Sequence, residues 1–224
     1  MISLPRSNRC GGKAGAAFTL PEVSVIICVM VILSGMGFAT LAKQRIKSGR
    51  MRCTTNLKNL GLAFRTGATD SVNGFPMSIS TNRGGTKECI GTGEVFRHFQ
   101  ALANELSTPA ILICPLGVGA RTKEAANWGV LANSNIDYFV GLDAAETNPS
   151  SLLAGDRWLT SNIPVTNHLL VLGTNATLAW QPTRHGDGGN VALGDGSVQG
   201  LTTRRLQEQI PTGTQAPLRL AIPQ

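Results

Sequence analysis

The sequence predicts an α+β protein in which the upper half of a long N-terminal helix packs against a mostly antiparallel sheet with long loops. Three observations lead to this fold class: an uncharged apolar run, an amphipathic pattern directly after it, and a long remainder of short apolar segments between turn-forming residues. The four corresponding segments are 1–17, 18–42, 43–66 and 67–224.

The uncharged run covers 23–42 and contains 20 residues, of which only two serines and one threonine are clearly polar. About 20 apolar residues in a helix span the roughly 30 Å of a bilayer core. The alternatives are a buried core helix and a secretory signal peptide. A core helix rarely has such a long uncharged stretch. A signal peptide has a shorter apolar region and a small-residue cleavage site, of which Thr40-Leu41-Ala42 is a poor version. The run therefore predicts a membrane-spanning helix that stays on the mature chain.

The segment 43–66 continues the helix with a different pattern. One apolar stripe recurs at i, i+4, i+7, i+8 and i+11, and no proline interrupts it. A single helix from Phe18 to Thr66 would be on the order of 70 Å long. The stripe predicts that this upper half packs against a globular domain. Its members are Cys53, Leu57, Leu60, Gly61 and Phe64.

The segment 67–224 is large enough for one core. Its one expected helix covers 93–106, where six apolar residues share a face. Short runs bounded by turn residues predict the strands. The expected strands are 111–114, 136–142, 152–154, 168–172, 178–180, 190–193 and 197–201.

The leader 1–17 carries three basic residues and no acid, and Phe-Thr-Leu-Pro-Glu follows it. This arrangement resembles the processing site of type IV prepilins and of the pseudopilins of type II secretion. The resemblance implies a pilin-like fold, cleavage by prepilin peptidase between Ala17 and Phe18, and N-methylation of Phe18. One departure is that Ala17 stands where these families usually have glycine, which would slow processing.

Glu22 is the fifth residue after the implied cut and directly precedes the apolar run. A carboxylate at the edge of a bilayer costs several kcal/mol unless it is neutralised or paired. The resemblance implies that Glu22 pairs with the new N-terminal amine of a neighbouring subunit and so sets the register of assembly.

A second motif, RHGDGGNVALGDGSV, begins at Arg184. It resembles the C-terminal segment of a large bacterial prepilin-like family, in which a histidine, nine residues and Asp-Gly recur. His185, Asp195 and Gly196 occupy those places. The pattern predicts two short strands joined by a tight turn, with glycines supplying positive φ angles, and His185 is placed to bond Asp195 across the hairpin base.

The same motif has a second interpretation as a calcium site. Asp187, Asn190 and Asp195 offer hard oxygen ligands within nine positions, and some of the pseudopilins that the sequence resembles carry calcium near the C-terminus. Glycine-rich loops are more often simple turns, and the sequence has no EF-hand spacing. We therefore expect no cofactor, with calcium as the alternative.

Charge is unevenly distributed along the chain. The net charge is +7; residues 43–65 contribute +7 with no acid, whereas 66–224 carry −2. Basic residues beside a membrane helix attract anionic lipid headgroups. No nucleic-acid partner is expected, because no basic surface with interleaved aromatics recurs in the main body.

An enzyme is not expected. Ser197, His185 and Asp187 supply the residue types of a hydrolytic triad, but no Gly-x-Ser-x-Gly nucleophile elbow is present. The three histidines are too scattered in sequence for a zinc motif.

Cysteine usage adds one expectation about redox state. Cys53, Cys89 and Cys114 lie outside the leader and the apolar run, so at most two of them pair within one molecule. One disulfide including Cys114 is expected in an oxidising periplasm. The pairing stays open, as does the alternative that all three are reduced.

Together these features predict a membrane-anchored filament subunit, a pseudopilin of a type II secretion-like system. The alternatives are a type IV pilus subunit and a tethered binding domain that never polymerises. By resemblance, the partners are prepilin peptidase, other pilin-like subunits, a platform protein, an assembly ATPase and the membrane. Charge on both flanks of the run leaves the orientation open. The resemblance places the protein as a single-pass component of the bacterial inner membrane with a periplasmic C-terminal domain.

Overall fold

The computed structural model describes residues 19–70, 74–116, 122–181, 186–210 and 217–224, without the side chains of 34–43, 45 and 46. The described part is α+β, and all its strand pairs are antiparallel. The chain divides into two units, Met1–Arg45 and Ile46–Gln224. Each unit is described by itself below.

The helix α1 (Leu20–Asp70) has 51 residues and belongs to both units. It ends four residues beyond the expected position, because the apolar stripe continues past Phe64 to Ala68, which is 3% exposed. The predicted stripe is confirmed. Its large side chains are fully buried: Cys53, Leu57, Leu60 and Phe64.

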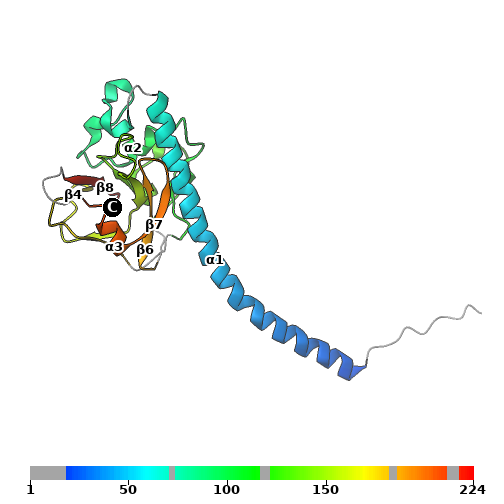
Figure 1. Cartoon of the computed structure of the whole chain (residues 1–224). Helices are drawn as coiled ribbons and strands as arrows, with labels where there is room; N and C mark the ends of the chain where they lie inside the picture. The colour runs from blue at the N-terminus through cyan, green and yellow to red at the C-terminus, as the bar shows by residue number, and fades with distance from the viewer. Residues whose placement is uncertain (1–18, 71–73, 117–121, 182–185, 211–216) are drawn as a thin grey trace, which may run out of the picture. The chain divides into compact units, whose positions relative to one another are not determined.

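A six-stranded sheet in the order β4-β8-β1-β2-β6-β7 forms the centre of the second unit, and β3 pairs with β5 in a separate two-stranded sheet. Figure 1 shows the second half of α1 beside the hairpin β6–β7. The strands are β1 (Tyr138–Gly141), β2 (Leu152–Asp156), β3 (Leu159–Ser161), β4 (Leu169–Leu172), β5 (Leu178–Trp180), β6 (Gly188–Leu193), β7 (Val198–Thr202) and β8 (Leu218–Ala221).

The central sheet is covered on both faces, because successive side chains of a strand point to opposite sides. Tyr138 and Val140 belong to the apolar core that contains the buried stripe of α1 and the helix α2 (Phe96–Gln100). Phe139 belongs to a second core with the helix α3 (Thr203–Gln207) and the small sheet β3–β5. The strands of the central sheet are therefore mostly apolar on both sides.

Six of the seven expected strands are present, with boundaries shifted by at most two residues. The expected strand at 111–114 is wrong, since Pro109–Leu112 forms a 3₁₀ helix with a proline in its first turn. The strands β3 and β8 were not expected. The 3₁₀ helices are Pro76–Ser78, Thr81–Arg83, Lys87–Cys89, Pro109–Leu112, Trp128–Val130 and Asn133–Asn135.

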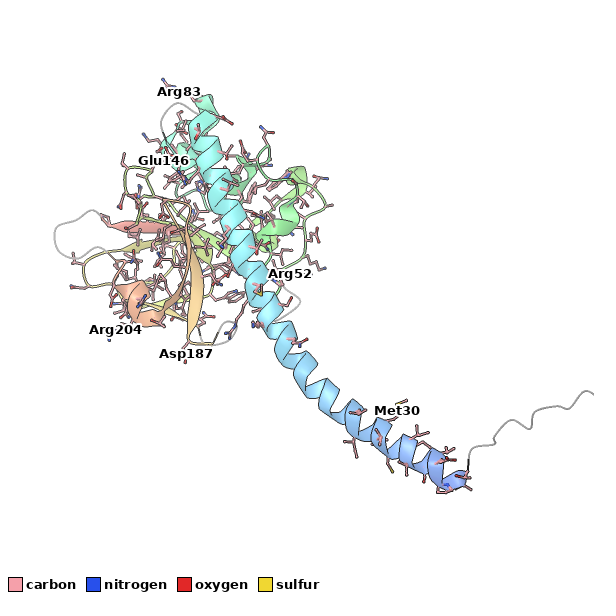
Figure 2. The ribbon with its side chains drawn as sticks, turned by 45° about the vertical axis from the view of Figure 1, so that its right-hand side comes forward. Met30, Arg52, Arg83, Glu146, Asp187 and Arg204 are labelled. Atoms are coloured by element: carbon pink, nitrogen blue, oxygen red, sulfur yellow. A yellow bond between two sulfur atoms is a disulfide. The ribbon has the colours of Figure 1, made fainter. Side chains whose placement is uncertain are left out.

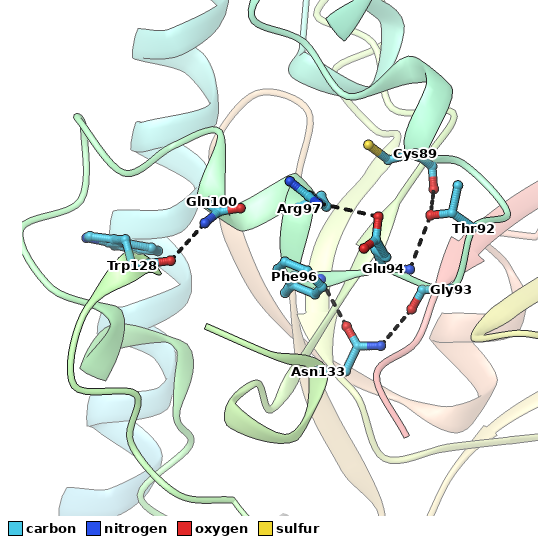
Figure 3. Close-up of polar contacts among 9 residues, drawn as sticks. All are labelled: Cys89, Thr92, Gly93, Glu94, Phe96, Arg97, Gln100, Trp128 and Asn133. Atoms are coloured by element: carbon cyan, nitrogen blue, oxygen red, sulfur yellow. Dashed lines mark hydrogen bonds and ion pairs between the residues drawn. The ribbon is translucent and has the colours of Figure 1, made fainter. Parts of the chain in front are cut away.

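The helix expected at 93–106 is much shorter, and α2 covers only Phe96–Gln100. Gly93 has φ +83°, which a right-handed helix does not allow. Asn133 fixes this entry, because its Nδ2 donates to the Gly93 carbonyl at 2.6 Å and its Oδ1 accepts from the Phe96 amide at 3.0 Å (Figure 3). The residues after Gln100 form turns, yet Leu102 and Leu106 are buried as the predicted apolar face requires.

Candidate functional site

The first turn of α1 is stabilised by a contact between Thr19 and Glu22. Glu22 Oε2 accepts hydrogen bonds from the Thr19 amide at 2.9 Å and from Thr19 Oγ1 at 2.7 Å. The Val23 amide donates to the Thr19 carbonyl, which makes Thr19 the N-cap residue. A glutamate three residues after a threonine N-cap and bonded to its amide is half of a capping box. Within the described residues, the Glu22 carboxylate therefore has a local structural role.

The side chains that follow Glu22 form a continuous apolar surface. Every described residue from 20 to 33 is exposed, and Leu20 is 85% exposed. Exposing rather than burying each large apolar side chain costs about 1.5–3 kcal/mol in water. Met30, which is labelled in Figure 2, belongs to this surface. Its large apolar members are Leu20, Val23, Val25, Ile26, Ile27, Val29, Met30, Val31, Ile32 and Leu33.

Other parts of the predicted processing and membrane segment lie outside the described residues. Ala17 and Phe18, the implied cleavage pair, are among them, as are the side chains of 34–42. Across the portion that the structure does describe, no helix has the combined length and apolar character needed to cross a membrane.

The Asp-Gly of the C-terminal motif forms the turn between β6 and β7, as the sequence predicts. Asp195 Oδ1 accepts from the Ser197 amide at 2.8 Å, and Gly196 has φ +82°. Hydrogen bonds from Ser197 hold the pKa of the exposed Asp195 carboxyl below its usual value. His185 lies outside the described residues, so its predicted bond to Asp195 stays a prediction.

This turn docks directly on α1. Arg65 Nη1 donates to the Asp195 carbonyl at 2.7 Å. A Cβ at Gly61 would lie 3.3 Å from the Gly196 carbonyl oxygen, and a Cβ at Gly196 would lie 3.0 Å from Arg65 Cδ. These two glycines let the hairpin turn approach the helix closely. The motif therefore joins two segments that are 130 residues apart.

The three residues of the alternative calcium site are not brought together. Asp187 precedes β6 and Asp195 follows it (Figure 2 labels Asp187). Six residues of strand at about 3.3 Å each separate these carboxylates by roughly 20 Å. Asn190 instead donates from its Nδ2 to Asp156 Oδ2 at 3.1 Å. Among the described residues, no group of three or more histidine, cysteine or acidic side chains is placed to hold a metal ion.

Sequence reasoning missed two buried carboxylates at the ends of β1 and β2. Asp156 Oδ2 accepts from the amide and the side chain of Asn190. Asp137 Oδ2 accepts from the Cys114 amide at 3.1 Å, and its Oδ1 lies 3.2 Å from Arg157 Nη2. Burial, with the charge of Asp156 as the next cause, raises the pKa of Tyr138. The sequence signal that could have found these carboxylates is a single acidic residue at the end of an apolar strand segment, as Asp137 is before β1 and Asp156 is in β2.

The disulfide joins Cys53 of α1 to Cys114, with Cα atoms 5.3 Å apart. This confirms one disulfide that includes Cys114 and decides the pairing that the sequence left open. Cys28 and Cys89 are free. The bond fixes the loop after Pro109–Leu112 to the buried face of α1.

Comparison with models of protein families, with curated proteins and with solved structures finds no match for this chain. The residues and contacts above therefore carry the functional argument.

Proposed function

We propose that this chain is a membrane-anchored filament subunit of the pseudopilin kind, processed before Phe18 and held as a single-pass protein in a bacterial inner membrane. The single observation that carries the proposal is the exposed apolar surface at 20–33, directly after the Thr19–Glu22 cap. Such a surface needs an apolar environment, which lipid and the helices of neighbouring subunits both supply.

The proposal assigns separate roles to the two parts of the chain. The apolar half of α1 anchors and assembles, and the unit Ile46–Gln224 is the periplasmic pilin-like domain. The partners are prepilin peptidase, other pilin-like subunits, a platform protein and an assembly ATPase. The role is assembly rather than catalysis and uses no cofactor. A subunit of a type IV pilus would use the same features, and loss of secretion or of surface fibres after gene deletion separates these two cases.

A second candidate is a tethered domain that never polymerises, and one observation favours it. The Glu22 carboxylate already accepts two hydrogen bonds from Thr19. A helix cap explains this residue without a neighbouring amine. The two candidates differ in whether the charge of Glu22 is needed.

Processing is tested on the chain purified from membranes. Mass spectrometry of the N-terminus is expected to find a mature chain that begins with methylated Phe18. An intact leader, or a cut near Ala42, would contradict the proposal, because the peptidase would then not recognise this site.

Assembly is tested by three substitutions of Glu22. Glu22→Ala is expected to leave membrane insertion intact, because it makes the segment more apolar, and to abolish or misregister assembly. Glu22→Lys is expected to fail more severely, because it places two cations together where screening is poor. Glu22→Gln is the matched control, since a glutamine also completes a capping box but carries no charge. Crosslinking between neighbouring α1 helices measures the result.

If Glu22→Gln assembles poorly while its helix is intact, the charge pairs with an amine, as the proposal requires. Normal assembly of both Glu22→Gln and Glu22→Ala would show that the charge of Glu22 is not needed for assembly, whereas absence of crosslinking between α1 helices of the original chain would favour the tethered domain.

A further inference from the structure

A groove beside α1 in the unit Ile46–Gln224 has a volume of about 560 Å³. One wall is the side of α1 at Asn59, Leu62 and Ala63, and the other is the loop after α2. That loop contributes Glu105 and Leu106, and the 3₁₀ helix Pro109–Leu112 contributes Ile111. We call this cavity the Glu105 groove.

Glu105 is the only charged residue among the described residues that line the groove. Its Oε2 is buried and has no hydrogen-bond partner among them. A buried oxygen without a partner costs free energy that a donor from outside the groove would recover. Glu105 lies at the level of Gly67 on α1, because a Cβ at Gly67 would be 3.8 Å from Glu105 Oε1.

The groove is also incompletely covered on its apolar side. Leu62, at its rim, is 64% exposed although the buried face of α1 lies next to it. An occupant that fits the groove therefore combines an apolar side chain, to cover Leu62, with a cation, to pair with Glu105.

The chain itself carries this combination on α1. Met51 is 64% exposed, and Lys58 is exposed with no ion pair to a described residue. Residues seven apart on a helix share a face. Met51 and Lys58 therefore form an exposed apolar and basic pair, away from the stripe that packs against the sheet.

The spacing between Met51 and Lys58 matches the spacing between Leu62 and Glu105 when two α1 helices lie side by side. Met51 and Leu62 are eleven residues apart, which is about 16 Å along a helix. When a second α1 lies parallel and is displaced by that length, its Met51 reaches the level of Leu62. Its Lys58 then lies two residues, or about 3 Å, beyond the level of Gly67. A lysine side chain is long enough to cover that axial difference.

We infer that the Glu105 groove receives Met51 and Lys58 from α1 of a second copy of this chain. This inference rests on the proposed assembly and names its contact surface. Because the second α1 is displaced along the helix axis, Met51 and Lys58 of one copy meet Leu62 and Glu105 of the other, and the contact is heterologous rather than isologous.

The position of the contact is tested by disulfide crosslinking in membranes that contain the full chain. Cys10, Cys28 and Cys89 are replaced by serine, and the disulfide of Cys53 and Cys114 is kept. One copy carries Met51→Cys and a co-expressed copy carries Leu62→Cys. Oxidation is expected to join the two different copies, with either variant alone giving at most about a tenth of that yield. Equal yields from a single variant would overturn the heterologous contact.

The charge pair is tested by reversal in the same crosslinking background. Glu105→Lys and Lys58→Glu are each expected to lower the crosslinked yield about tenfold, since like charges at a contact cost several kcal/mol. The double variant is expected to return to within about twofold of the original yield. Lys87→Glu, an exposed lysine away from the groove, is the control and is expected to change nothing.

The double variant keeps the test informative if a single variant folds poorly, because restored crosslinking requires the swapped pair. Failure of the double variant, with tryptophan fluorescence unchanged, would overturn the inference. Crosslinking between cysteines placed in 20–33 is measured in parallel. If those form while the groove pair does not, the inference fails and the proposed assembly stands; if neither forms, both fail.

Discussion

Two stretches of α1 differ in whether their apolar side chains are exposed or buried. From 20 to 33 the large apolar side chains surround α1 and all are exposed. From 53 to 68 most of them follow one stripe and are buried, with Leu57 and Leu60 at 0% exposure, whereas Leu62 lies outside the stripe and is 64% exposed. The backbone conformation is the same in both stretches, so the distribution of side chains around the helix decides which one joins the core.

The two stretches therefore obtain their stability from different sources. The second stretch obtains it from the sheet and from α2 in its own unit, where Phe64 packs edge-on to Phe75 with ring centroids 6.1 Å apart. The first stretch has no such cover among the described residues of its unit. Its stability must come from an environment that supplies apolar contact.

The largest expected effect is that of Phe64→Ala. The ring is fully buried and also lies 6.4 Å from the Phe99 ring, so its removal is expected to cost about 4–5 kcal/mol of unfolding free energy. Ile27→Ala, in the exposed stretch, is expected to cost less than about 0.5 kcal/mol in the same assay. Urea unfolding of the full chain in detergent, followed by tryptophan fluorescence, measures both. Similar losses would show that the two stretches do not differ as described.

Loss of the disulfide is expected to have a slightly smaller effect. Cys53 and Cys114 are separated by 61 residues, and closing a loop of that length is worth about 4 kcal/mol. Reduction, or Cys53→Ala with Cys114→Ala, is expected to lower the stability of the unit Ile46–Gln224 by that order. Cys89→Ala is the control, because this thiol is free. Equal midpoints in urea with and without reductant would contradict this expectation.

Acid is expected to weaken the second stretch through His98, which packs in the same unit. Burial lowers the pKa of His98 to about 4, and its Nδ1 lies 2.7 Å from Thr86 Oγ1. Because the folded pKa is below the ordinary value near 6.5, the unfolded chain binds the proton more readily. The stability is therefore fully present above about pH 6.5 and falls by up to about 3 kcal/mol as the pH drops to 4.

Unfolding free energies measured at pH 7 and pH 4.5 for the original chain and for His98→Gln test this origin. The variant is expected to be less stable at pH 7 and to lose less stability on acidification. An equal acid loss in both proteins would assign the effect to other groups.

The features that could be predicted from the sequence depend on repeated or local patterns. The buried stripe of α1 repeats every three or four residues over several turns, so one misplaced residue does not hide it. The turn at Asp195 and Gly196 follows from the residues within it. The bond from Thr19 to Glu22 was not predicted, although a threonine and a glutamate three residues apart are the sequence signal of a capping box.

The features that were missed depend on distant parts of the chain. Nothing within residues 218–221 shows that they pair with both β4 and β1, although Leu218 and Leu220 alternate with Arg219. The proposed calcium ligands looked close because nine sequence positions seem short. The strand predicted at 190–193 already separates them, and β6, which begins at Gly188, extends that separation along the whole interval between Asp187 and Asp195.

The position of β8 has a consequence for the order of folding. This strand lies between β4 and β1, so it is inserted into the sheet rather than added at its edge. Until residues 218–221 are available, β1 has one unpaired side and β4 has no partner strand in the central sheet. A chain that emerges from its N-terminus can therefore form α1 and the hairpin β6–β7 early, but its final cooperative step waits for β8. Throughout that interval, the unpaired edges of β1 and β4 are available for pairing with other chains.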